Sequence, residues 1–124
     1  MTRYLKYGLI VLMFALSSFV SLDEVVSAIK KGNASQLSKF FDNTIEITVE
    51  DKKNTYSKSQ AELVLKDFFS NSAVKDFSII HKGDNSGAQF IIGTLKTKNG
   101  EYRTTIYMMQ KGNKNLLQEL RFEK

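Results

Sequence analysis

The fold of this chain is decided by residues 76–123, which read DFSIIHKGDNSGAQFIIGTLKTKNGEYRTTIYMMQKGNKNLLQELRFE. Stretches of apolar and β-branched residues alternate there with short polar turns, which is typical of antiparallel strands. Asn99-Gly100 is the strongest two-residue hairpin signal, and Gly112-Asn113 is a second turn of the same length. The spacing predicts a meander of four long strands. The whole chain contains no proline, so its turns must be made by glycine and short polar residues.

Two-residue turns also fix the register of the strands, and the register sorts side chains between the two faces of the sheet. Pairing Lys98 with Glu101 and Lys111 with Lys114 predicts that Tyr107 lies beside Gln118. The face that contains this pair has more apolar residues and is predicted to be the inner one; it holds Phe77, Ile79, His81, Phe90, Ile92, Thr94, Arg103, Thr105, Tyr107, Met109, Leu116, Gln118, Leu120 and Phe122. A bulge in any strand would exchange the faces locally.

Two short helices are predicted near the start of the folded part. The first covers residues 23–31, and Gly32 is placed to end it in the left-handed conformation. Asn33 is a suitable cap for the second, whose buried face consists of Leu37, Phe40 and Phe41 and which is predicted to end near residues 42–43. Helices therefore come first in the chain and the strand meander comes last.

A strand and a longer helix are predicted between these short helices and the meander. Apolar and polar residues alternate over 45–50, which predicts a strand with one buried face, and residues 55–56 can pair back on it. Ser57 and Gln60 have the spacing of a capping box, and the apolar positions that follow recur at helical spacing over 57–70. This helix must lie on the core.

The composition of the 124 residues, 42% hydrophobic and 25% charged, is that of one globular domain. The absence of cysteine excludes disulfides and thiolate metal sites, and the single histidine, His81, excludes a site with two imidazoles. The sequence has no acid–histidine spacing for a metal, no glycine-rich phosphate loop and no serine in a nucleophile elbow. We therefore expect no cofactor and no metal.

The first residues have the layout of a signal peptide. Arg3 and Lys6 precede an uncharged stretch over 7–22, which is short for a bilayer span and has small residues near its end. We expect a signal peptide over 1–21 and one domain over 22–124, exported to the periplasm or secreted. An uncleaved N-terminal anchor is the alternative.

The charge of the domain does not favour a nucleic-acid partner. Of the 18 basic residues, two belong to the expected signal peptide, so the domain carries a net charge of +3 rather than +5. Its lysines are scattered among acidic residues, whereas nucleic-acid binders gather basic residues on one face. We expect a solvated surface.

Five short motifs of the domain match the pattern of one protein family. They are YSKSQAE at 56–62, KDFF at 66–69, GTL at 93–95, GEYR at 100–103 and QELRFE at 118–123. As a set they resemble the DUF4783 family, small exported proteins without an assigned activity, mostly from Bacteroidetes, in the NTF2-like superfamily. The resemblance implies an α+β, NTF2-like (cystatin-like) cone, in which N-terminal helices pack on a strongly curved antiparallel sheet. The resemblance also implies that a pocket is expected at the mouth of the cone, because cones of this kind often have one there.

The superfamily includes enzymes that use an aspartate, with a histidine or tyrosine, to move a proton inside the cone. No carboxylate lies at the centre of the predicted inner face, so no catalytic residue is predicted. The polar side chains on that face instead predict a ligand site, with Tyr107 and Gln118 at its base and Thr105, Arg103 and His81 around it. Alternatively, Tyr107 and Gln118 satisfy each other in the core, Arg103 pairs with an acid, and His81 is an edge residue.

Three functions remain open at this stage. The first is a non-catalytic module of the cell envelope that binds a small hydrophobic ligand or an envelope protein. The second is an NTF2-like enzyme with acid–base chemistry in the cone. The third is a structural module that forms homodimers through the predicted outer sheet face, whose apolar centre is a large patch to leave in water. That centre consists of Ile91, Leu95, Ile106, Met108 and Leu117.

Overall fold

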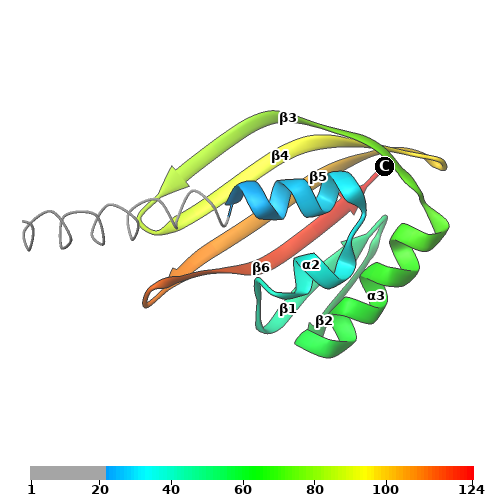
Figure 1. The fold of residues 1–124 in the computed structure, drawn as a ribbon. Helices are drawn as coiled ribbons and strands as arrows, with labels where there is room; N and C mark the ends of the chain where they lie inside the picture. The colour runs from blue at the N-terminus through cyan, green and yellow to red at the C-terminus, as the bar shows by residue number, and fades with distance from the viewer. Residues whose placement is uncertain (1–21) are drawn as a thin grey trace, which may run out of the picture.

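The structure is a computed structural model that describes residues 22–124, in which a curved six-stranded sheet carries the described helices on one face (Figure 1). Residues 22–31 form the first helix. The other elements are α2 (Ala34–Ser38), β1 (Phe41–Val49), β2 (Lys52–Ser57), α3 (Lys58–Asn71), β3 (Val74–Asn85), β4 (Ala88–Thr97), β5 (Gly100–Lys111) and β6 (Lys114–Glu123). The expected signal peptide, residues 1–21, lies outside the described residues.

The strands are ordered β2-β1-β6-β5-β4-β3, so β2 and β3 form the two edges of the sheet. The predicted antiparallel meander is confirmed for β3 to β6. β1 pairs antiparallel with β2 and parallel with β6, which joins the first hairpin to the last strand. No described helix is long and apolar enough to cross a membrane.

The helix ends agree with most of the predicted caps. Gly32 has a φ of 62°, and the side chain of Asn33 accepts a hydrogen bond of 3.0 Å from the Gln36 amide. The capping box of Ser57 and Gln60 is present at the start of α3.

The predicted end of the second helix at 42–43 is wrong, because α2 ends at Ser38. Phe41 is buried as the first residue of β1 and pairs with Leu117 of β6. The Phe40 carbonyl accepts a hydrogen bond of 2.6 Å from the Leu117 amide. Phe40 and Phe41, which are at helical spacing from Leu37, thus lie in the turn before β1 and in β1 itself, and the sequence alone does not distinguish this arrangement from a helix.

The turn between β4 and β5 lies one residue earlier than predicted. Thr97 pairs with Gly100, so Lys98 and Asn99 are the turn residues and Phe90 lies opposite Tyr107. The hydroxyl of Thr97 holds this turn by accepting from the Asn99 amide at 3.1 Å and donating to the Gly100 carbonyl at 2.9 Å. The shift moves the pairing by two residues and leaves each side chain on its predicted face.

A bulge in β6 overturns the predicted pairing of Tyr107 with Gln118. Lys111 pairs with Lys114 as predicted, but the register shifts after Met108, so that Tyr107 pairs with Glu119 and Gln118 is the extra residue. Beyond a bulge the side chains of a strand change face. The sequence contains no signal for this bulge.

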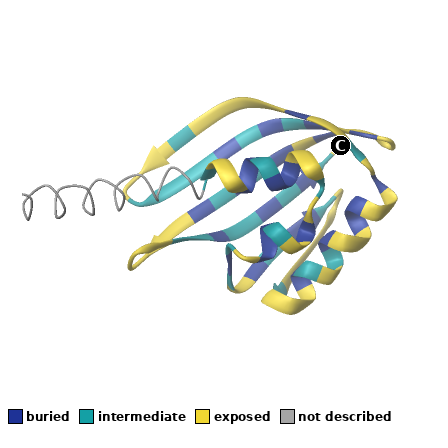
Figure 2. Ribbon diagram, in the orientation of Figure 1, coloured by how far each residue is buried: buried dark blue, intermediate teal, exposed yellow. Residues whose placement is uncertain are grey.

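The assignment of the two sheet faces is also corrected. Ile91, Leu95, Ile106, Met108 and Leu117, which were predicted to form an outer dimer face, are at most 1% exposed. They form the core together with the helices, so these five side chains are not an outer face of the sheet. Figure 2 shows buried residues alternating with more exposed ones along these strands.

The bulge explains much of this inversion. Leu120 and Phe122 are fully buried, and they lie on the face of Ile106 and Thr104 rather than on that of Thr105 and Arg103. A register without the bulge places Leu120 and Phe122 on the face of Thr105 and Arg103, which makes that face the more apolar one. The convex face of the sheet carries most of the residues predicted to be inside, whereas Phe77, Leu120 and Phe122 do lie in the core.

Candidate functional site

A groove of about 420 Å³ lies between α3, the inner side of the β1–β2 hairpin and the β4–β5 turn. Its apolar side chains come from β1 and α3, and its polar ones come from β2, α3, β5 and the two turns β1–β2 and β4–β5. They are Ile47, Val49, Glu50, Lys52, Asn54, Tyr56, Val64, Asp67, Phe68, Asn71, Ser72, Asn99 and Tyr102. A hollow of about 450 Å³ beside Gly32 and Lys66 is more open to solvent.

The floor of the groove is aromatic and fixed by packing. The Phe68 ring meets the edge of the Tyr102 ring at a centroid distance of 5.3 Å and stacks on the Phe122 ring at 4.5 Å. The Lys124 ammonium lies 5.2 Å from the centroid of the Tyr102 ring, a cation–π contact. Phe68 and Tyr102 are buried, so their positions are set by the core.

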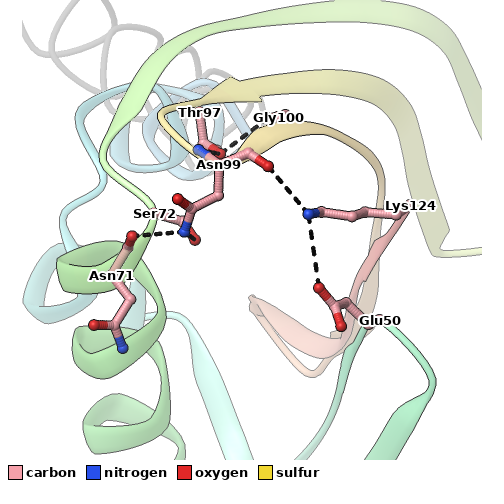
Figure 3. A network of polar contacts seen from close by, with 7 residues as sticks. All are labelled: Glu50, Asn71, Ser72, Thr97, Asn99, Gly100 and Lys124. Carbon is pink, nitrogen blue, oxygen red and sulfur yellow. Dashed lines mark hydrogen bonds and ion pairs between the residues drawn. The ribbon is translucent and has the colours of Figure 1, made fainter.

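Hydrogen bonds tie the rim of the groove together at the β4–β5 turn (Figure 3). The side-chain amide of Asn99 donates to the Asn71 carbonyl at 2.8 Å and to the Ser72 hydroxyl at 3.0 Å. Lys124 donates to the Asn99 carbonyl at 3.0 Å and forms an ion pair of 3.8 Å with Glu50. The end of α3, two turns and the last residue of the chain therefore hold one another in place.

Several polar side chains of the groove have no partner among residues 22–124. Tyr56, Tyr102, Asn54 and Lys52 form no hydrogen bond or ion pair through their side chains. Asp67 accepts a single hydrogen bond of 3.3 Å from Asn71. Two hydroxyls, an amide, an ammonium and a carboxylate thus surround the aromatic floor and are available to a bound molecule.

This arrangement is better suited to binding than to proton transfer. Its carboxylates belong to Asp67 and Glu50, which are exposed at the rim rather than enclosed with a base. The lining contains no histidine. Within the described part of the chain, no group of three His, Cys, Asp or Glu side chains is placed to hold a metal ion.

The residues predicted to form a ligand site do not line this groove. Arg103, Thr105 and Tyr107 lie on the convex face of β5, and His81 is exposed on β3 with its ring 5.6 Å from the Phe90 ring. Their predicted place inside the cone is wrong. His81 lies within β3, which is an edge strand of the sheet.

Gln118, the fifth of these residues, has a structural partner. Its side-chain amide donates a hydrogen bond of 2.8 Å to the carboxylate of Asp42, which also accepts from Lys111. These contacts, that of Lys111 foremost, and a hydrogen bond from the Asn43 amide lower the pKa of Asp42 from 3.8 to about 2. Gln118 therefore anchors the start of β1 to the β5–β6 hairpin.

The sequence reasoning missed the groove residues, although two of the quoted motifs contain them. KDFF supplies Asp67 and Phe68, and GEYR supplies Tyr102. Their common location depends on the pairing of β1 with β6 and on the correct inner face. Neither follows from local pattern.

The convex face combines an apolar cluster with charged residues. Phe90, Ile92, Tyr107 and Leu116 are half-buried there, and Met109 is 37% exposed; we call these five side chains the convex cluster. Glu46 and Glu119 lie side by side in the pairing of β1 with β6.

The carboxyl groups of these two glutamates interact, and the interaction shifts their pKa values in opposite directions. Burial and the neighbouring Glu46 raise the pKa of Glu119 above its ordinary value. The hydrogen bond from Glu119 lowers the pKa of Glu46, which also pairs with Lys53 at 3.2 Å. Glu119 is thus the member of the pair that keeps its proton to higher pH.

Comparison with known proteins agrees with this architecture. A family model described as Domain of unknown function (DUF4783) matches residues 22–123. The chain belongs to the DUF4783 family. No curated protein matches this DUF4783 chain.

Solved structures of other DUF4783 proteins are similar over the whole domain. A protein from Bacteroides fragilis is 33% identical with a TM-score of 0.77, over 82% of this chain and 95% of that one. One from Bacteroides uniformis is 30% identical with a TM-score of 0.79, over 82% and 94%. An NTF2-like design is 12% identical with a TM-score of 0.68, over 87% and 97%, which shows the fold alone. The DUF4783 domain has the NTF2-like fold.

Proposed function

We propose that this DUF4783 protein is a non-catalytic binding module of the cell envelope, exported to the periplasm or secreted, whose ligand lies in the groove beside α3. The observation that carries the proposal is a set of polar groups at the aromatic floor that form no hydrogen bond or ion pair within residues 22–124, namely those of Tyr56, Tyr102, Asn54 and Lys52. A rigid apolar base with a few polar groups around it is the usual composition of a ligand pocket. The exposed position of its carboxylates supports binding over catalysis.

The test is a native mass measurement of the full chain purified from its own host. We expect a species carrying an added mass, and a chain that has lost its N-terminal segment. Tyr102→Phe keeps the ring and removes the hydroxyl. Its affinity for the added molecule should fall about tenfold, the value of one hydrogen bond of ~1.4 kcal/mol, and its loaded fraction should fall accordingly. Tyr107→Phe, on the convex face, is the matched control. No added mass, or an equal loaded fraction in all three proteins, would refute the proposal.

A second function, self-association, is favoured by the convex cluster. No described helix covers this face of the sheet (Figure 1), and its five side chains are all partly accessible. Contiguous apolar surface of this kind is typical of interaction sites. We propose that two copies of the chain pack against each other through the convex cluster. The concave face is not available for this contact, because it is buried in the core.

Light scattering at micromolar concentration tests this second proposal. We expect a doubled mass for the natural chain and a single mass for Met109→Glu, because a buried unpaired charge opposes association. Ser70→Glu, on the exposed side of α3, should leave the doubled mass unchanged. A single mass for the natural chain would contradict self-association.

A further inference from the structure

One edge of the sheet is a regular strand, β2, which has no partner on its outer side among residues 22–124. β2 pairs with β1 over six consecutive residue pairs, from Val49–Lys52 to Thr44–Ser57, without a shift in register. It is the outermost strand on its side of the sheet. A regular edge strand presents a row of unpaired N–H and C=O groups with the spacing of another strand.

The opposite edge lacks this regularity. The register of β3 with β4 shifts between Val74 and Asp76 and again between Ile79 and His81. Such bulges interrupt the spacing of backbone groups and twist an edge away from further pairing. Of the two edges, β2 is therefore the one suited to accept a strand.

Helix α3 lies next to this edge and exposes apolar surface. α3 follows β2 directly, and Val64 and Asp67 of α3 face Asn54 and Tyr56 of β2 across the groove. Leu63, which is adjacent to this line of residues on the helix, is 65% exposed. A strand and a helix with a groove between them form a site for an extended chain, whose backbone pairs with the strand while alternate side chains enter the groove.

The start of β2 carries two lysines that differ in their charged partners. Lys52 and Lys53 project to opposite faces of β2, because they are neighbours in a strand. Lys53 is paired with Glu46 on the convex side at 3.2 Å, whereas Lys52 lines the groove and has no ion pair within the described residues. An ammonium with no internal partner fits a carboxylate of the bound molecule.

We propose that the groove takes an extended polypeptide segment, which pairs with the outer edge of β2, places alternate side chains over Val64 and Phe68, and sets a carboxylate against Lys52. This inference rests on the proposed function, because it names the ligand class of the same groove. A partner protein that offers a free strand with an acidic side chain has the required chemistry.

The experiment starts from a displayed library of peptides about six residues long, the length of β2. Binders are selected on the full chain, and their affinities are measured by fluorescence anisotropy. Each selected peptide is then made in two N-methylated forms, blocked at odd or at even amides. A paired strand uses alternate amides for the shared ladder, so one form should lose affinity by about tenfold or more while the other keeps it.

The side-chain part of the inference is tested with two exposed lysines. Lys52→Glu should weaken the selected peptides by about tenfold, and Lys96→Glu, on the convex face, should not. Equal loss from both N-methylated forms, unchanged affinity in Lys52→Glu, or no peptide binder would overturn the peptide inference. If native mass measurement still shows a small molecule whose loading needs Tyr102, the proposed function stands and only the ligand class is refuted; if neither binds, both fall.

Discussion

At the scale of the residue, Asp42 joins parts of the chain that are far apart in sequence. Its carboxylate accepts hydrogen bonds from Lys111, Gln118 and the Asn43 amide, and its side chain is 13% exposed. Hydrogen bonds to a charged group contribute more than those between neutral groups. The lowered pKa of Asp42 therefore corresponds to stability that exists only while the carboxyl is ionised.

We predict that Asp42→Asn lowers the free energy of unfolding by about 1–2 kcal/mol at pH 7. The folded pKa lies below the unfolded one, so this stability is fully present above pH 3.8 and is lost as the pH falls through about 2. Urea unfolding at pH 7 and near pH 2 measures the difference. Asp51→Asn, at an exposed turn position, is the control, and a difference that does not depend on pH would contradict the explanation.

The pair Glu46–Glu119 contributes to stability with a pH dependence opposite to that of Asp42. The folded pKa of Glu119 is raised, so the protonated carboxyl stabilises the fold and this contribution is lost as the pH rises above 4.5 through the raised value. Glu119→Gln keeps the donor without the titration. We predict that it raises stability by about 0.5–1 kcal/mol at pH 8 and has little effect near pH 4.

Glu123→Gln is the control for this prediction, because Glu123 pairs with Arg121 at 3.3 Å rather than with an acid. It should lower stability slightly or leave it unchanged at both pH values. A gain at pH 8 from Glu123→Gln as large as that from Glu119→Gln would show that net charge, rather than the carboxyl pair, determines the effect.

At the scale of the element, the β4–β5 turn fixes the end of α3. Asn99→Ala removes both hydrogen bonds from its side-chain amide and leaves the buried Ser72 hydroxyl without that donor. We predict a loss of about 1–2 kcal/mol in unfolding free energy and faster amide exchange in the last turn of α3. Asn54→Ala, whose side chain has no partner within residues 22–124, should change stability by less than about 0.5 kcal/mol.

Close packing between β3 and β4 depends on Gly93. A Cβ atom there would lie 2.6 Å from the Phe77 ring and 2.6 Å from the Ser78 carbonyl oxygen. We predict that Gly93→Ala lowers the thermal midpoint by at least several degrees, corresponding to about 2 kcal/mol or more. Adding Phe77→Leu should not restore the midpoint, because the contact with backbone oxygen remains. A Cβ atom at Gly87 would make only an ordinary contact, 3.7 Å from Gln110, but the φ of Gly87 is 84°, so the cost of Gly87→Ala is conformational and is unaffected by Phe77.

Sequence patterns predict the elements well where their causes are local. The cap at Asn33, the capping box at Ser57 and the left-handed Gly32 depend on neighbouring residues, and all three are confirmed. The β4–β5 turn is displaced because a side chain before it, Thr97, supplies hydrogen bonds that a two-residue rule ignores. The early end of α2 depends on Leu117, a partner from the far end of the chain.

At the scale of the whole molecule, the α+β class and the order of helices before strands are predicted, whereas the inner face and the site are not. The choice of face depends on a single extra residue, Gln118, which changes the side of Leu120 and Phe122. The groove requires β1 to lie against β6, a contact that no local periodicity encodes. The predicted ligand residues therefore lie on the convex face and at an edge.

The parallel pairing of β1 with β6 determines when the core can form during folding. Asp42 and Gln118, which meet across this contact, are 76 residues apart. The first hairpin and α3 cannot dock on the sheet until the final strand is available, and such distant contacts slow folding because a long loop must close first. A ribosome-bound chain that lacks β6 should thus remain without its complete core, and the core should form only after the final strand has been released.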